Sequence, residues 1–225
     1  MKTPTRCTPA LMLAATLAAA GTTAAQYTTV KSPPKSELSH AELLSGALGQ
    51  SFAATGRGSR DLAGSSIYAS RISDSSDQIW SGGEFTASII GREAGYRHTF
   101  GYIQDRAFNP ILRTDNDDAS ATFAIDGDYT WAIQNDKQNG GDLWSSKKSH
   151  NRDRKDHMVT YALYDNDKLT GFALFFEDLP RWHADRDYND AAVLLSIVPT
   201  PQAAGMALAG LGGLGLATGR RRRDS

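Results

Sequence analysis

Residues 171–198 read GFALFFEDLPRWHADRDYNDAAVLLSIV, and this stretch decides the fold. It holds two almost wholly apolar runs, 171–176 and 191–198, each of the length expected for a strand that is buried on both faces. The residues between the runs are polar and rich in aspartate. The stretch therefore predicts two core strands joined by an acidic loop.

Short alternating or apolar runs, separated by clusters of Asp, Asn and Gly, continue through the chain from Ile67 onward. Many short strands with frequent turn signals are typical of an antiparallel sandwich. We expect an all-β, jelly-roll-like β-sandwich with hairpin turns at 126–128 and 165–167, and a flexible polar excursion over 135–156. The expected strands cover 66–72, 84–91, 98–103, 110–113, 121–125, 129–134, 157–164, 170–176 and 191–198.

A linker and a short helix precede the sandwich. Pro33 and Pro34 lie in a polar stretch that predicts an extended linker, and 36–48 has helical apolar spacing with a cap at Ser36 or Ser39. Residues 50–66 are rich in Gly and Ser and predict a loop. The expected organisation is 1–25 signal peptide, 26–57 linker and helix, 58–198 sandwich domain and 199–225 sorting signal.

The N-terminal segment has the three parts of a secretory signal peptide. A basic start (Lys2, Arg6) precedes an apolar run of about 11 residues, and small residues then lead to a cleavage point after Ala25. The alternative is a membrane anchor, but a spanning helix needs about 20 apolar residues. The sequence therefore predicts an exported protein.

The C-terminal segment combines a proline motif, an uncharged Gly/Ala/Leu-rich run over 203–217 and a cluster of arginines. This arrangement resembles the PEP-CTERM type of sorting signal, with Thr200 at the position usually held by Glu. The resemblance implies an exosortase-like membrane protease as partner, with the short transmembrane helix holding the chain in the membrane before processing. A plain tail anchor is the alternative. The motif residues are Val198, Pro199, Pro201, Arg220, Arg221, Arg222 and Arg223.

Charge and cysteine content exclude several classes of protein. The formal net charge is −1, but without the two ends the chain has 18 basic and 24 acidic residues, which disfavours a nucleic-acid-binding protein. Cys7, the single cysteine, lies in the expected signal peptide. The exported part is therefore expected to have no disulfide, no Cys-ligated zinc and no catalytic thiol.

The acidic loop is the strongest candidate site. Concentrated carboxylates repel one another unless a cation neutralises them, and Ca²⁺ accepts six to eight oxygen ligands. The loop is not an EF-hand, because Asp190 stands where Gly is required and Ser196 where Glu is required. The alternative is an Asp/Asn-rich turn that caps its own backbone. The candidate ligands for Ca²⁺ are Glu177, Asp178, Asp185, Asp187, Asn189 and Asp190.

Two motifs resemble an uncharacterised (DUF-type) domain of bacterial surface proteins. The first is Phe-Glu-Asp-Leu at 176–179 followed by Asp-Arg-Asp-Tyr-Asn-Asp at 185–190, and the second is the Ala-Gly-Tyr and Phe-Gly-Tyr segment over 94–102. The resemblance covers roughly 58–198, and departs from the family at 182–184, where Trp-His-Ala replaces Gly-Gly. It implies an extracellular β-domain with no established reaction.

Other chemistries have weaker support. A zinc site at His183 would need further nitrogen or sulfur ligands, and no second His lies nearby. A glycosidase would need two separated carboxylates, whereas Glu177 and Asp178 are adjacent. The sequence also has no nucleophile-elbow pattern, so Ser-His-Asp catalysis lacks support. We therefore expect no catalytic residues.

Basic and aromatic side chains leave a binding role open. The basic run over 147–155 is either a solvated loop or a contact for polyanions such as extracellular polysaccharide or lipid headgroups. Trp80 and Trp131 are expected in the core, whereas Trp144 and Trp182 have polar flanks and are candidates for stacking on a sugar. The sequence thus favours a non-enzymatic, Ca²⁺-stabilised domain of the cell envelope, outer surface or matrix, with a carbohydrate-binding module and a secreted hydrolase as alternatives.

Overall fold

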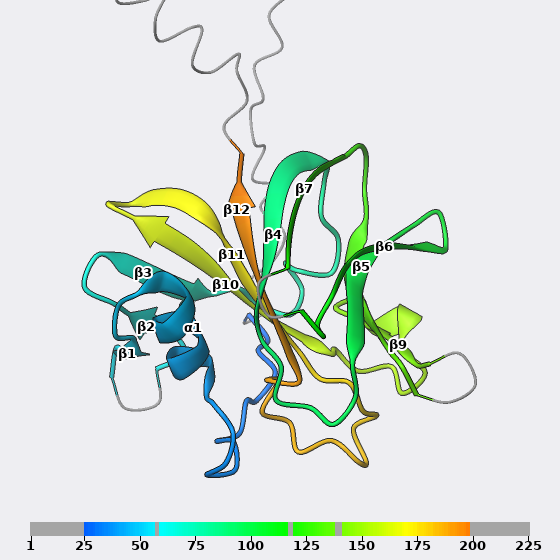
Figure 1. Ribbon diagram of the computed structural model, residues 1–225, viewed down its shortest axis with the longest axis horizontal. Coiled ribbons are helices and arrows are strands. Elements are labelled where there is room, and N and C mark those ends of the chain that lie inside the picture. The colour runs from blue at the N-terminus through cyan, green and yellow to red at the C-terminus, as the bar shows by residue number, and fades with distance from the viewer. Residues whose placement is uncertain (1–24, 57–58, 117–118, 138–140, 199–225) are drawn as a thin grey trace, which may run out of the picture.

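The computed structural model describes residues 25–198 except 57–58, 117–118 and 138–140. Within this part of the chain, twelve strands form two antiparallel sheets, and one α-helix lies beside the larger sheet (Figure 1). The all-β sandwich with a short N-terminal helix is therefore confirmed. The expected signal peptide and the sorting-tail residues from Pro199 onward lie outside the described residues.

The larger sheet has the strand order β1-β2-β3-β10-β11-β12-β4-β7, and every neighbouring pair is antiparallel. Its strands are β1 (Ala53–Ala54), β2 (Leu62–Ala63), β3 (Ile67–Arg71), β4 (Gly83–Gly91), β7 (Ser120–Ile125), β10 (Met158–Asp165), β11 (Lys168–Phe176) and β12 (Ala191–Ile197).

The smaller sheet has the order β6-β5-β8-β9 and is also antiparallel. Its strands are β5 (His98–Gln104), β6 (Ala107–Arg113), β8 (Thr130–Asn135) and β9 (Leu143–Ser145). Figure 1 shows this sheet on one side of β12 and the helix α1 (His40–Leu48) on the other.

The apolar run of β11 is explained by two cores, one on each face of the larger sheet. Phe172, Leu174 and Phe176 belong to the core shared with the smaller sheet, whereas Ala173 and Phe175 belong to the core beneath α1. Side chains alternate across a strand, so a strand with a core on each face must be apolar throughout. The expectation that β11 is buried on both faces is confirmed.

The helix α1 begins at a complete capping box. Ser39 accepts a hydrogen bond from the backbone N–H of Glu42, and the Glu42 carboxylate accepts one from the backbone N–H of Ser39. Leu43 and Leu44 are buried against the larger sheet, so the helix completes the second core. Of the two expected caps, Ser39 is the one used.

The turns differ partly from expectation. The turn at 165–167 joins the paired strands β10 and β11, with Asn166 and Asp167 both at positive φ, as a tight hairpin requires. Residues 126–128 instead connect β7 in one sheet with β8 in the other, so the hairpin expected there is wrong. The hairpin between β5 and β6 turns at Asp105 and Arg106, which also have positive φ.

The stretch 135–156 is not simply a flexible excursion. It contains β9, a 3-10 helix η1 (Lys148–His150) and the fully buried Trp144. The Asn151 side chain fixes this segment, because its amide donates to the carbonyls of Ser145 and Lys155 and its Oδ1 accepts from the backbone N–H of Ser145. The loop expected over 50–66 likewise contains the two-residue strands β1 and β2.

Candidate metal centre

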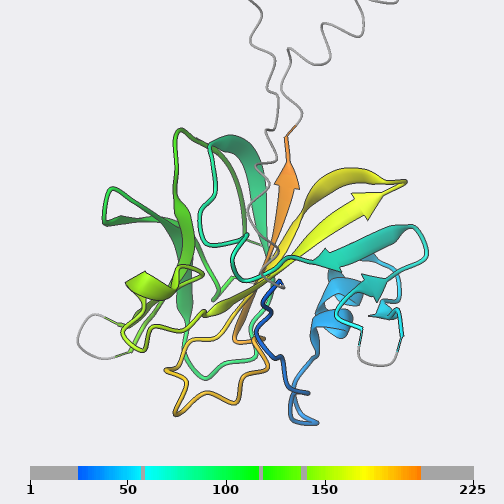
Figure 2. The same cartoon turned by 180° about the vertical axis from the view of Figure 1, so that it is seen from behind.

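The acidic loop joins β11 to β12 at the lower end of the sandwich. Figure 2 shows this loop next to the segment that precedes α1, and the backbone N–H of Lys31 in that segment donates to the carbonyl of Arg186 at 2.9 Å. Strand pairing of Phe176 with Ala191 fixes both ends of the loop. The six expected ligands are thereby brought to one end of the molecule, where they separate into two groups.

The first group contains Glu177, Asp178 and Asp190, each of which has a carboxylate oxygen within 4.8 Å of the others. The backbone N–H of Asp178 donates to Asp190 Oδ2 at 2.8 Å, and the backbone N–H of Arg186 donates to Glu177 Oε2 at 3.0 Å. Burial, then the charges of Asp178 and Glu177, raises the pKa of Asp190 to about 10. One oxygen of each of the three carboxyl groups thus already has a hydrogen-bond partner in the protein.

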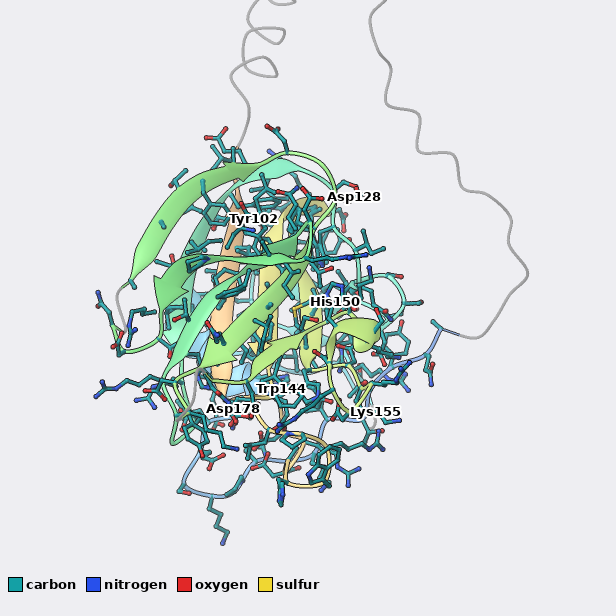
Figure 3. All side chains as sticks on the ribbon, turned by 90° about the vertical axis from the view of Figure 1, so that its right-hand side faces the viewer. Tyr102, Asp128, Trp144, His150, Lys155 and Asp178 are labelled. Atoms are coloured by element: carbon teal, nitrogen blue, oxygen red, sulfur yellow. The ribbon has the colours of Figure 1, made fainter. Side chains whose placement is uncertain are left out.

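Asp178 also ties the acidic loop to the smaller sheet. Its Oδ2 lies 2.7 Å from His98 Nε2 of β5, and its backbone carbonyl accepts a hydrogen bond from Asn135 Nδ2 of β8 at 3.1 Å. His98 and Asp178 are both buried (2% exposed). Figure 3 shows Asp178 at the lower end of the sheets. These contacts explain the first group as a structural clamp between the two sheets.

The second group contains Glu37, Asp185 and Asp187, whose carboxylate oxygens also lie within 4.8 Å of one another. Asn189 joins it, because its Nδ2 lies 3.4 Å from Glu37 Oε2 and donates to the carbonyl of Leu38 at 3.0 Å. Glu37 belongs to the segment before α1, so this group connects two parts of the chain that are far apart in sequence.

Two buried oxygens of the second group lack hydrogen-bond partners among the described residues. They are Asp187 Oδ2 and Asn189 Oδ1, on side chains that are 2% and 1% exposed. Leaving a buried acceptor unsatisfied costs about 1–3 kcal/mol. Burial first, and then the Asp185 charge, raises the pKa of Asp187 to about 7. A cation bound here would be coordinated by these oxygens, and its charge would neutralise the carboxylates.

The backbone contributes to this arrangement. Arg186 and Tyr188, the residues on either side of Asp187, both have positive φ (71° and 60°). Residues other than glycine adopt this conformation at a cost. The loop therefore holds Asp187 between two residues that both have the left-handed backbone conformation.

The sequence identified all six acids and amides of the loop by composition alone, but it did not indicate that they form two separate groups. It missed Glu37, because nothing in a helix-leading segment shows that it meets a loop about 150 residues later. It also missed His98, whose place on β5 carries no local sign of an acidic partner. Among the described residues, neither acidic group includes a histidine, so His183 lies outside both.

The two candidate tryptophans have opposite environments. Trp144 is fully buried and stacks on His157 with ring centroids 4.1 Å apart, so its expected role in stacking on a sugar is wrong. The polar residues around Trp144 indicated a loop, whereas Trp144 lies in the three-residue strand β9. Trp182 is 65% exposed, and Trp131 is fully buried in the core, as expected.

Comparisons with protein-family models, curated proteins and solved structures found no match. No helix among the described residues is long and apolar enough to span a membrane.

Proposed function

We propose that this chain is an exported, non-enzymatic domain of the cell envelope or extracellular matrix that is stabilised by Ca²⁺. The ion would bind the second acidic group, with Glu37, Asp185 and Asp187 supplying carboxylate oxygens and Asn189 its amide oxygen. One observation carries the proposal: Asp187 Oδ2 is buried without a partner in a group with two further carboxylates. Asn189, whose Nδ2 lies 3.4 Å from Glu37, has a second buried oxygen without a partner, Oδ1. Ca²⁺ suits such a site because it accepts carboxylate and amide oxygens in flexible geometry and fills its remaining positions with water.

The proposed role is mechanical. The ion would join the segment before α1 to the loop that connects the two central strands, and so hold the helix against the larger sheet. The clamp between Asp178 and His98 fastens the same loop to the smaller sheet. Bound Ca²⁺ would therefore complete the connection of all three layers at one end of the molecule.

Calcium binding is tested by isothermal titration of the metal-free protein. We expect one Ca²⁺ per chain, with binding lost in Glu37→Gln and in Asp187→Asn. Asp190→Asn is the matched control, since Asp190 belongs to the first group and should leave binding in place. Loss of binding in Asp190→Asn together with retention in Glu37→Gln would move the site to the first group.

The proposal for export and sorting is supported by the signal-peptide pattern and by the resemblance of the C-terminal segment to PEP-CTERM signals. Processing by an exosortase-like protease removes the segment after about Pro201. Intact mass of the protein from the cell envelope tests this, and a species that retains Arg220–Arg223 would favour the plain tail anchor.

A carbohydrate-binding module is the second candidate function, because Trp182 presents a 65% exposed ring beside the acidic loop. Glycan binding that is lost in Trp182→Ala would support it. Retained binding in that variant would argue against a stacking role for this ring.

A further inference from the structure

A cavity of about 400 Å³ lies next to the acidic loop and outside the proposed calcium site. Its wall is formed by the N-terminal residues 26–29, the basic segment 154–157 and part of the β11–β12 loop. None of Glu37, Asp185 or Asp187 lines it. Figure 3 shows Lys155, one of its lining residues, at the same lower end of the sandwich as Asp178. The cavity is far larger than an inorganic ion needs and falls in the range of small-molecule sites.

Four basic side chains that line the cavity have no acidic partner among the described residues. They are Arg154, Lys155, Arg181 and Arg186. The Nε of Arg186 is buried and makes no hydrogen bond in this part of the chain. Lys148 also lines the cavity and pairs with Asp74 at 3.7 Å. Cations without counter-ions that converge on one cavity favour an anionic ligand.

Acidic and hydroxyl groups in the same wall narrow the ligand class. Asp156 is 3% exposed, and its Oδ2 is buried without a hydrogen-bond partner among the described residues, although its Oδ1 accepts from the backbone N–H of Met158. Thr28, Thr29 and Tyr188 also line the cavity. Asp74 and Glu177 line the cavity as well. Inorganic phosphate or sulfate would offer these carboxyl groups few or no hydroxyl donors. A ligand with both an anionic group and several hydroxyl donors would use the bases and the acids together.

We infer that this cavity binds a carboxylated sugar, such as a uronic-acid unit of an extracellular polysaccharide. The basic side chains would bind the carboxylate, and Asp156 Oδ2 would accept a hydrogen bond from a sugar hydroxyl. Arginine is suited to the first task because its planar fork matches a carboxylate in two parallel hydrogen bonds. This inference gives the carbohydrate-binding alternative a site and a ligand class, and it stands independently of calcium.

The test is titration of the full chain with digalacturonate, using its methyl-esterified form as the neutral control. We expect binding of digalacturonate that weakens as salt rises, and binding of the ester at least tenfold weaker. The double variant Lys155→Gln/Arg181→Gln should weaken digalacturonate binding at least tenfold. Both of these side chains are exposed, so the variant should fold, and an unchanged melting temperature verifies this. The double variant Arg106→Gln/Lys168→Gln removes the same charge at two exposed positions outside the cavity, so it is the charge-matched control and should leave binding unchanged.

Several results would overturn the inference. These are no binding of digalacturonate at millimolar concentration, equal binding of the ester or of inorganic phosphate, and binding that is unaffected in the double variant. Binding to vesicles containing phosphatidylglycerol in preference to digalacturonate would replace the sugar with a lipid surface. Binding of a neutral glycan that depends on Trp182 would mean that the protein binds carbohydrate at Trp182 and not in this cavity.

Discussion

Protonation of His40 should lower the stability of the folded protein as the pH falls. His40 is the first residue of α1, is 6% exposed and stacks on Phe175 with ring centroids 3.9 Å apart. Its Nε2 donates to the carbonyl of Tyr188 at 3.0 Å, and in the neutral imidazole its Nδ1 accepts from the Tyr161 hydroxyl at 3.2 Å. The neutral imidazole therefore has a hydrogen-bond partner for both of its ring nitrogens.

Burial, with a smaller contribution from the Arg71 charge, lowers the pKa of His40 from its usual 6.5 to about 3. Between these values the unfolded chain binds the proton and the folded protein does not. Stability is therefore complete above pH 6.5 and declines as the pH falls toward 3. The slope is about 1.4 kcal/mol per pH unit. The loss at pH 5 relative to pH 8 is about 2 kcal/mol.

The assay is urea unfolding of the wild-type protein and of His40→Gln, each at pH 8 and pH 5. Glutamine does not titrate, so the variant should lose about 2 kcal/mol less than the wild type between the two pH values. Other titrating groups are common to both proteins and cancel in this comparison. Equal losses in the two proteins would refute the assignment of the neutral, buried imidazole.

Three further predictions concern other buried or capping groups. Burial raises the pKa of Asp77 to about 7, so its contribution to stability is present below the unfolded pKa of 3.8 and is lost as the pH rises through 7. Between pH 5 and pH 8 the free energy of unfolding of the wild type should therefore fall by on the order of 2 kcal/mol more than that of Asp77→Asn, measured by urea unfolding. Equal falls in the two proteins would contradict the raised pKa. Ser39→Ala should lower stability by about 1 kcal/mol in denaturant melts because the α1 cap is lost, whereas Ser36→Ala should have no effect. Asp178→Ala should cost about 1–3 kcal/mol because it leaves His98 Nε2 buried without its hydrogen-bond partner, and a melting temperature similar to that of Asp165→Ala would contradict the clamp.

The strands could be predicted because their signal is local. The run over 171–176 is apolar at every position since β11 has a core on each face, and the cap at Ser39 needs only Glu42 three residues later. Both features are complete within one short window of sequence. Hydrophobic periodicity and capping chemistry therefore located the main elements correctly.

The failures arise where contacts are distant or elements are very short. Trp144 lies on a strand of three residues, too short for periodicity to show, and its burial depends on His157 of the neighbouring segment. The division of the acidic loop depends on Glu37 and His98, which reach it from other parts of the chain. Composition could mark the loop as acidic, but only the fold divides its members into the group that contacts His98 and the group that includes Glu37.

Calcium stabilisation is tested most directly by thermal melts of the wild-type protein and of Asp187→Asn, each in Ca²⁺ and in EDTA. Ca²⁺ at a hundredfold excess over its Kd should stabilise the wild type by about 2.7 kcal/mol. This corresponds to a rise of roughly 5–10 °C for a domain of this size. Asp187→Asn should melt at or above the wild-type temperature in EDTA, because it removes a poorly solvated carboxylate, and should not respond to Ca²⁺. Identical wild-type melts in Ca²⁺ and EDTA would contradict the calcium site.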